Sequence, residues 1–182
     1  LPYLFNQLKL GLLAFKQANV GDLDCFGIDT WGVDFGLLDK HGHLLGNPRA
    51  YRYSVDEDME EAWKVVDFPT LFQRTGIATM NFNTVYQLWC DAKSGKAAKA
   101  KHFLMMPEYL SYKLTGKMRN EYTNASTTSM VNAENKTWDD GIIERIGVSR
   151  DIFLPLSLPG TEVGELKAEI VEKVGFESTV LL

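Results

Sequence analysis

The segment from Gly27 to Phe35 combines side-chain types that bind small polar ligands. It carries two carboxylates, Asp29 and Asp34, and a tryptophan, Trp31, beside a glycine, Gly32. Its apolar residues recur mostly at every second position, as in a strand, and a carboxylate buried in a strand needs a polar partner. A glycine without a side chain lets a ligand reach the main chain. The segment therefore predicts either ligand contact at Gly32 or an exposed edge strand whose carboxylates face water.

A second polar segment runs from Glu121 to Ser129 and shows little periodicity. Its hydroxyl, amide and carboxylate side chains could contact a ligand. Residues of these types also bond to neighbouring backbone groups in loops and turns. We therefore expect a hydrogen-bonded loop or hairpin here, with ligand contact as the alternative.

Histidines and cysteines indicate no metal or redox site in this sequence. His41, His43 and His102 have no carboxylate at metal-ligand spacing, and we expect them at the surface. Cys25 and Cys90 lack the CxxC-type spacing of a zinc site and are too few for a disulfide framework, so two buried free thiols are expected. Walker, GxGxxG, GxSxG and HExxH motifs are also absent. Generic motifs therefore predict no catalytic, cofactor-binding or metal-binding residue.

The composition is that of an ordinary soluble globular protein of 182 residues. Its net charge of −5 and pI near 5.2 argue against nucleic acid as a partner, because affinity for phosphates comes largely from Lys and Arg. No stretch approaches ~18 consecutive apolar residues, and the first residues lack the basic stretch and apolar core of a signal peptide. These features favour a reducing, cytoplasmic location with no membrane contact. They do not indicate an oligomeric state.

The segments that must position the polar residues alternate between helical and strand-like patterns. Residues 25–39 are strand-like, with an interruption at Gly32. A turn is expected after them, and residues 43–45 are expected to return as the partner strand. Short strands are also expected at 163–166 and 178–182, and an apolar run covers 103–106. Helical periodicity, capping residues and flanking glycines predict helices at 1–15, 56–66, 69–75, 84–94, 108–114, 138–146 and 168–174. This alternation indicates an α/β or α+β fold.

Five blocks of the sequence carry a family resemblance: Gly27–Phe35, Asn47–Arg52, Phe82–Leu88, Met106–Lys117 and Glu121–Thr128. They resemble the FGGY family of carbohydrate kinases, and within it the rhamnulokinase branch. They occur in the family's order with similar gaps, and together they span most of residues 1–182. The Asp29–Asp34 block points to the rhamnulokinase branch, whereas Tyr122–Ala125 is shared more widely in the family.

This resemblance implies an α/β fold of two ribonuclease H-like (actin-like ATPase) domains around a cleft. It implies an enzyme that phosphorylates a small-molecule sugar, L-rhamnulose, at O1 with ATP and Mg²⁺. Gly32 matches a sugar-contacting position of that branch. Trp31, Val33 and Asp34 flank it and are the other candidate substrate-binding residues. The argument from the missing side chain at Gly32 agrees with this match.

Departures from the family pattern concern the catalytic machinery. The family's first strands, with a phosphate-binding loop rich in glycine and serine, would precede Leu1. The catalytic base, an aspartate in a His-Asp-Thr motif, and the ATP domain would follow Leu182. We therefore expect residues 1–182 to be part of an N-terminal sugar-binding domain, with no catalytic, cofactor-binding or metal-binding residue and no activity by itself. The alternatives are another FGGY sugar kinase, for L-fuculose or a pentulose, and a non-enzymatic sugar-binding module.

Overall fold

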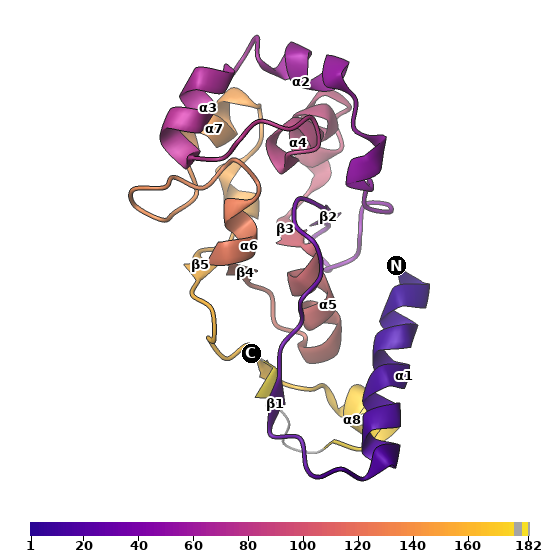
Figure 1. Cartoon of the computed structure of the whole chain (residues 1–182). Coiled ribbons are helices and arrows are strands. Elements are labelled where there is room, and N and C mark those ends of the chain that lie inside the picture. The colour runs from indigo at the N-terminus through magenta and orange to yellow at the C-terminus, as the bar shows by residue number, and fades with distance from the viewer. Residues whose placement is uncertain (177–179, 182) are drawn as a thin grey trace.

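Short strands and mostly short helices alternate along the chain (Figure 1), and the computed structural model describes residues 1–176 and the backbone of 180–181. The helices are α1 Pro2–Ala18, α2 Asp56–Ala62, α3 Phe68–Thr75, α4 Thr84–Lys93, α5 Met106–Thr115, α6 Tyr122–Ser126, α7 Asp140–Arg145 and α8 Ala168–Val174. The strands are β1 Cys25–Phe26, β2 Phe35–Leu38, β3 His102–Met105, β4 Asn120–Glu121, β5 Leu156–Ser157, β6 Gly164–Glu165 and β7 Val180–Leu181. Single 3₁₀ turns occur at Tyr51–Tyr53, Ala97–Lys99 and Arg150–Ile152.

Local signals place the ends of α3, α5 and α8 within two residues of the predicted ones. By contrast, α2 ends at Ala62 instead of 66, and α1 continues to Ala18 instead of 15. The side chain of Asp67 accepts the Thr70 N–H at the start of α3, and Gly76 ends that helix at φ 70°. Pro107 lies in the first turn of α5, and Gly116 ends it at φ 77°. The observed bounds of α8 are those predicted from the sequence. Helices with strong caps were therefore predictable from nearby residues.

The stretch at 25–39 does not form the single strand that its alternation predicts. It consists of β1 and β2, separated by an irregular segment at 27–34, because Val33 adopts φ 66° and turns the chain. The expected return at 43–45 is present as an antiparallel bridge between Leu44 and Leu38, and the Leu45 N–H donates to the Leu37 carbonyl oxygen at 2.8 Å. It is too short to count as a strand, and the strand that pairs along the whole of β2 is β3, in antiparallel orientation. Asp39 explains the tight reversal, since its carboxylate accepts the N–H groups of His41 and His43.

Within the described residues, three small sheets join segments that lie far apart in the sequence. β1 pairs parallel with β7, and β7 pairs antiparallel with β6. β4 pairs parallel with β5. Within the strand expected at 178–182, residues 180–181 are confirmed as β7 and the others lie outside the described residues. The α/β alternation predicted from the sequence is therefore present, in short pieces.

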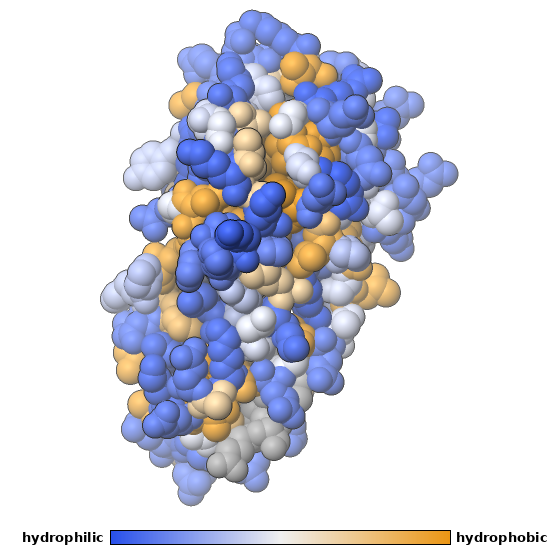
Figure 2. Space-filling view, turned by 180° about the vertical axis from the view of Figure 1, so that it is seen from behind, coloured by the Kyte–Doolittle hydropathy of each residue, from blue (hydrophilic) through white to orange (hydrophobic). Residues whose placement is uncertain are grey.

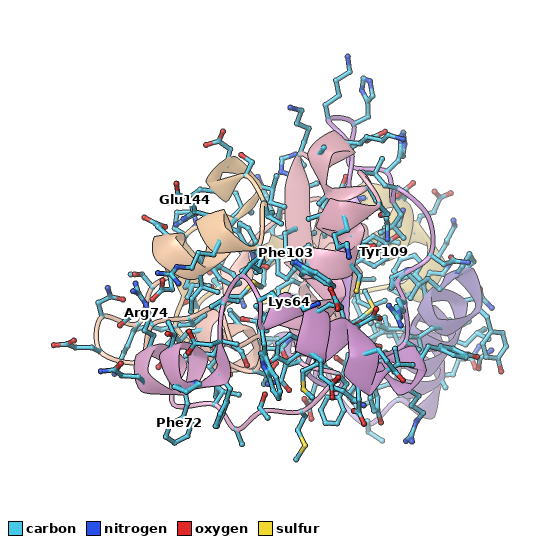
Figure 3. All side chains as sticks on the ribbon, turned by 90° about the horizontal axis from the view of Figure 1, so that it is seen from above. Lys64, Phe72, Arg74, Phe103, Tyr109 and Glu144 are labelled. Carbon is cyan, nitrogen blue, oxygen red and sulfur yellow. The ribbon has the colours of Figure 1, made fainter. Side chains whose placement is uncertain are left out.

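The larger hydrophobic core surrounds Phe103 on β3, which is 0% exposed. Its ring stacks on Phe35 with centroids 5.1 Å apart, and it also contacts Phe153 at 4.9 Å. Trp138 meets the same ring edge-on at 5.8 Å. Figure 3 shows Phe103 among the crowded side chains at the centre of the molecule, with Phe72 at its periphery. This aromatic cluster supports the β2–β3 pair from which the 27–34 segment departs.

A smaller core joins α1 to α8, which lie side by side in Figure 1. Ile170 and Val174 of α8 are buried there, and Leu8 and Leu12 of α1 pack against the buried cluster. On the other face of α1, Tyr3 and Leu10 are exposed. Leu4 and Phe15 lie on the same face as Leu8 and Leu12 and stay partly exposed, and the Phe15 ring lies 6.0 Å from that of Phe176. Figure 2 shows the back of the molecule, where apolar groups are separated by hydrophilic side chains. Among the described residues, no helix has both the length and the apolarity to span a membrane.

The expectation of two buried thiols is wrong for Cys25. Cys25 is exposed because β1 turns it away from the smaller core, while the next residue, Phe26, packs against that core. Cys90 is half-buried on α4, and burial, with the nearby Asp58 carboxylate as a smaller cause, raises its pKa to about 11. A thiol with so high a pKa is almost wholly protonated at neutral pH and is a poor nucleophile.

Candidate functional site

A cavity of about 500 Å³ opens where the 27–32 segment faces the first half of α5, the α6 region and the loop at 159–160. Its lining is mostly polar in residue type. The lining residues are Gly27, Ile28, Asp29, Thr30, Trp31, Gly32, Pro107, Glu108, Ser111, Arg119, Glu121, Thr123, Asn124, Thr127, Pro159 and Gly160. The volume suits a small ligand such as a monosaccharide.

Gly32 belongs to a three-residue turn at the cavity wall. The N–H of Asp34 donates to the Gly32 carbonyl oxygen at 2.9 Å, and Val33 at the centre of the turn has φ 66°. A Cβ on Gly32 would lie 3.0 Å from Thr127 Oγ1 and 3.2 Å from Thr127 Cγ2. The missing side chain therefore lets the turn approach the C-terminal end of α6 closely, and a Cβ there would push the Thr127 side chain aside.

Asp34 anchors the neighbouring indole instead of facing the cavity. Trp31 Nε1 donates to Asp34 Oδ2 at 2.8 Å, and the Tyr51 N–H donates to Oδ1 at 3.0 Å. The Asp34 residue is 3% exposed, and this burial raises the pKa of its carboxyl group, while the bonds from Trp31 and Tyr51 oppose the shift. Trp31, held in this way, remains 40% exposed and lines the cavity.

A buried glutamate, Glu108, lies on the opposite wall and is 5% exposed. Its Oε1 accepts the Glu121 N–H at 3.3 Å, and its Oε2 accepts Asn124 Nδ2 at 3.4 Å. Burial raises the pKa of Glu108 to about 7, and these two long hydrogen bonds only partly oppose that effect. Glu121 has a different role, because its carboxylate accepts the N–H groups of Thr123 and Asn124 and caps α6.

The structure brings two of the four predicted site residues into the cavity lining. Trp31 and Gly32 line it, whereas Val33 and Asp34 lie behind the wall and maintain its shape. The carboxylates of the 27–35 segment divide between the two expected environments: Asp29 is exposed and Asp34 is buried with partners.

Within the polar segment at 121–129, residues Tyr122–Ser126 form the short helix α6, so the expected loop or hairpin is wrong for this part. Residues 127–129 form a hydrogen-bonded turn as expected, in which Thr127 Oγ1 donates to the Asn124 carbonyl oxygen. The Glu121 cap explains the difference, because it satisfies the first N–H groups of a helix whose residues otherwise favour turns. Four residues of the 121–129 segment line the cavity, namely Glu121, Thr123, Asn124 and Thr127, which leaves the ligand-contact alternative for this segment open.

Sequence reasoning missed Glu108 and Arg119 as cavity residues. Glu108 follows Pro107 in the first turn of a helix, where a carboxylate is common because it suits the helix dipole. Nothing local therefore distinguishes it from an exposed residue. Arg119 donates to the Thr161 carbonyl oxygen, and burial lowers the pKa of its guanidinium.

The cavity combines an aromatic face with carboxylate, amide, hydroxyl and guanidinium groups. Such groups donate to and accept from the vicinal hydroxyls of a sugar, while an indole packs against its C–H face. In the part of the chain that the structure describes, no three His, Cys, Asp or Glu side chains are grouped so that they could hold a metal ion. The arrangement therefore suits binding of a polyhydroxylated ligand.

Comparisons of the sequence agree with this chemistry. A family model described as the N-terminal domain of the FGGY family of carbohydrate kinases matches residues 13–182. A rhamnulokinase of Halalkalibacterium halodurans is 44% identical over 182 residues, covering 98% of this chain and 39% of that protein. A rhamnulokinase of Enterococcus faecalis is 43% identical over 166 residues, covering 90% of this chain and 33% of that protein. The chain thus spans about a third to two fifths of these curated relatives.

Solved structures share the fold over nearly the whole chain. A xylulose kinase from Lactobacillus acidophilus superposes with a TM-score of 0.90 at 18% identity, covering 100% of this chain and 38% of that one. A Plasmodium falciparum glycerol kinase with ADP gives a TM-score of 0.77 at 17% identity, covering 98% and 37%. At such identities the match concerns the fold alone, and it agrees with the α/β, ribonuclease H-like fold that the family resemblance implied.

Proposed function

This chain belongs to the FGGY family of carbohydrate kinases, and on that premise we propose that the protein containing it phosphorylates L-rhamnulose. One observation carries the choice of sugar. The chain is 44% identical to a rhamnulokinase over 98% of its length. The proposal concerns the protein of which residues 1–182 are a part.

The proposed role of this chain is to hold the sugar. Gly32 and Trp31 contact it directly: the bare main chain at Gly32 meets a sugar hydroxyl, and the indole packs on the ring. Val33 and Asp34 do not contact the sugar. Val33 shapes the turn that presents Gly32, and Asp34 orients the Trp31 indole through a hydrogen bond. This division follows from which of the four residues line the cavity.

In the proposed reaction the terminal phosphoryl group of ATP passes to O1 of L-rhamnulose. The products are L-rhamnulose 1-phosphate and ADP, and the O1 proton passes to a carboxylate acting as general base. Such transfer depends mainly on positioning and on charge stabilisation, to which Mg²⁺ contributes. We assign the base, the nucleotide and the metal ion to parts of the protein outside residues 1–182.

The test is ADP release by the full-length protein over a panel of L-rhamnulose, L-fuculose, L-xylulose, D-xylulose and glycerol. A clear preference in kcat/KM for L-rhamnulose is the expected result. Preference for another sugar would support a sugar kinase of this family with a different substrate. A folded full-length protein that releases no ADP with any sugar would support a non-enzymatic sugar-binding module. The 182-residue chain alone should release none.

Gly32→Val should raise the KM of the full-length enzyme for its sugar roughly tenfold or more, since about 1.4 kcal/mol of lost binding is tenfold. The added side chain would collide with Thr127 and displace the turn that faces the sugar. Steady-state kinetics with sugar varied at saturating ATP measures the change. Gly11→Val is the matched control, because a Cβ at Gly11 meets nothing within 4 Å. An unchanged KM in Gly32→Val would remove Gly32 from the sugar site.

A further inference from the structure

We propose that Thr127 and Thr84 are positioning residues that hold the Val33 peptide in a strained turn and so place Gly32 for the sugar. This inference rests on the proposed function and deepens it. It assigns a role to two threonines from different helices, neither of which the sequence singled out for this function. The observation that carries it is a pair of hydroxyl groups that bind the two sides of one residue's backbone.

The backbone conformation of Val33 is unusual for its residue type. A β-branched side chain at φ 66° is rare, because its Cβ crowds the backbone in the left-handed region. Non-glycine residues persist there when the surroundings determine the conformation, and they concentrate at binding sites. Contacts with other residues therefore have to stabilise the left-handed conformation that Val33 does not itself favour.

Hydrogen bonds from side chains of two helices stabilise the Val33 backbone in this conformation. The Val33 N–H donates to Thr127 Oγ1 at 3.2 Å, from the C-terminal end of α6. On the other side, Thr84 Oγ1 at the start of α4 donates to the Val33 carbonyl oxygen at 2.7 Å. Gln87 Nε2 adds a longer bond of 3.4 Å to the same oxygen. The Val33 backbone is thus fixed at both ends by side chains from elements distant in the sequence.

Thr127 is itself held in place and lies tightly against Gly32. Its hydroxyl donates to the Asn124 carbonyl oxygen at 2.8 Å, which leaves a lone pair to accept from Val33. Its methyl group occupies the space that a Cβ on Gly32 would need. The Asn124 side chain in turn donates to Glu108 at 3.4 Å, so a chain of hydrogen bonds connects Thr127 through Asn124 to Glu108 in the cavity wall.

The two threonines differ in one respect that separates positioning from direct contact. Thr127 lines the cavity and could touch a sugar, whereas Thr84 is fully buried and is not in the lining. An effect of Thr84 on sugar binding therefore has to pass through the backbone of the turn. Equal effects at both positions would be the signature of a shared positioning role.

The experiment uses four variants of the full-length enzyme: Thr127→Val, Thr84→Val, Thr127→Ser and Thr84→Ser. Each valine variant removes the hydroxyl at nearly constant volume, and each serine variant retains it. We expect the valine variants to raise the KM for the sugar about five- to tenfold, in line with loss of one buried hydrogen bond. The KM for ATP and the kcat at saturating sugar should stay within about twofold of wild type. The serine variants should recover most of the sugar affinity.

Thr137→Val, on an exposed loop, controls for the substitution itself. Three results would overturn the inference: unchanged sugar KM in both valine variants, serine variants as defective as valine, or a defect in Thr127→Val without one in Thr84→Val. The last would mean direct contact by Thr127. A wild-type enzyme inactive on every sugar would overturn the proposed function and this inference with it. If the wild-type enzyme is active and any of the three results is found, the inference about the threonines is overturned and the proposed function stands.

Discussion

Phe103→Ala should lower the free energy of unfolding by about 4 kcal/mol, the largest stability effect expected here. Phe103 is fully buried and its ring contacts the rings of Phe35, Trp138 and Phe153. Removing it would leave a cavity among large rings that cannot collapse to fill it. Chemical denaturation followed by far-ultraviolet circular dichroism measures the change as a shift of the transition midpoint.

The matched control is Phe72→Ala, which removes the same side chain from a surface position. Phe72 is 51% exposed on α3 and contacts the ring of Phe68 at 5.8 Å. Its loss should change the free energy of unfolding by about 0.5 kcal/mol. Equal losses in the two variants would show that the cluster around Phe103 is not the stabilising core.

Glu108→Gln should remove a pH dependence of stability worth about 3 kcal/mol. The folded-state pKa of Glu108 is raised to about 7 from an ordinary value of 4.5. Between these values the folded state holds the proton more tightly than the unfolded state. The stability that the protonated group contributes is therefore fully present below about pH 4.5 and is lost as the pH rises through 7.

Urea denaturation at a series of pH values from 4 to 9 measures this effect. Wild type should lose stability across the range more steeply than Glu108→Gln, whose amide carries no titrating proton. Glu144→Gln, on the exposed face of α7 (Figure 3), should keep the wild-type slope. If Glu108→Gln and wild type have the same slope, the carboxyl of Glu108 is not held protonated by burial in the folded protein.

Elements determined by nearby residues were predictable, and the helices show why. Asp67 and Gly76 bound α3, and Gly116 ends α5, through bonds that span four residues or fewer. The family blocks likewise depend only on residue order. Fold class and family therefore followed from the sequence.

The geometry of the site was less predictable because distant residues determine it. Val33 alternates like a strand residue, yet its conformation depends on Thr127, 94 positions away. Glu108 has the type and place of an ordinary helix-start carboxylate, and its hydrogen-bond partners in the folded protein, Glu121 and Asn124, lie 13 and 16 positions further along the chain. The argument that Gly32 leaves room for a ligand was also incomplete, since Thr127 fills part of that room.

The pairing of α1 with α8 and of β1 with β7 bears on how the chain assembles during synthesis. About 150 residues separate the end of α1 at Ala18 from the start of α8 at Ala168, and translation of that length takes roughly 8–30 s. The aromatic cluster around Phe103 needs only residues up to Phe153 and can form while the rest is still being made. The apolar face of α1 stays without its partner throughout that interval. Substitutions there should act first on the yield of folded protein in the cell.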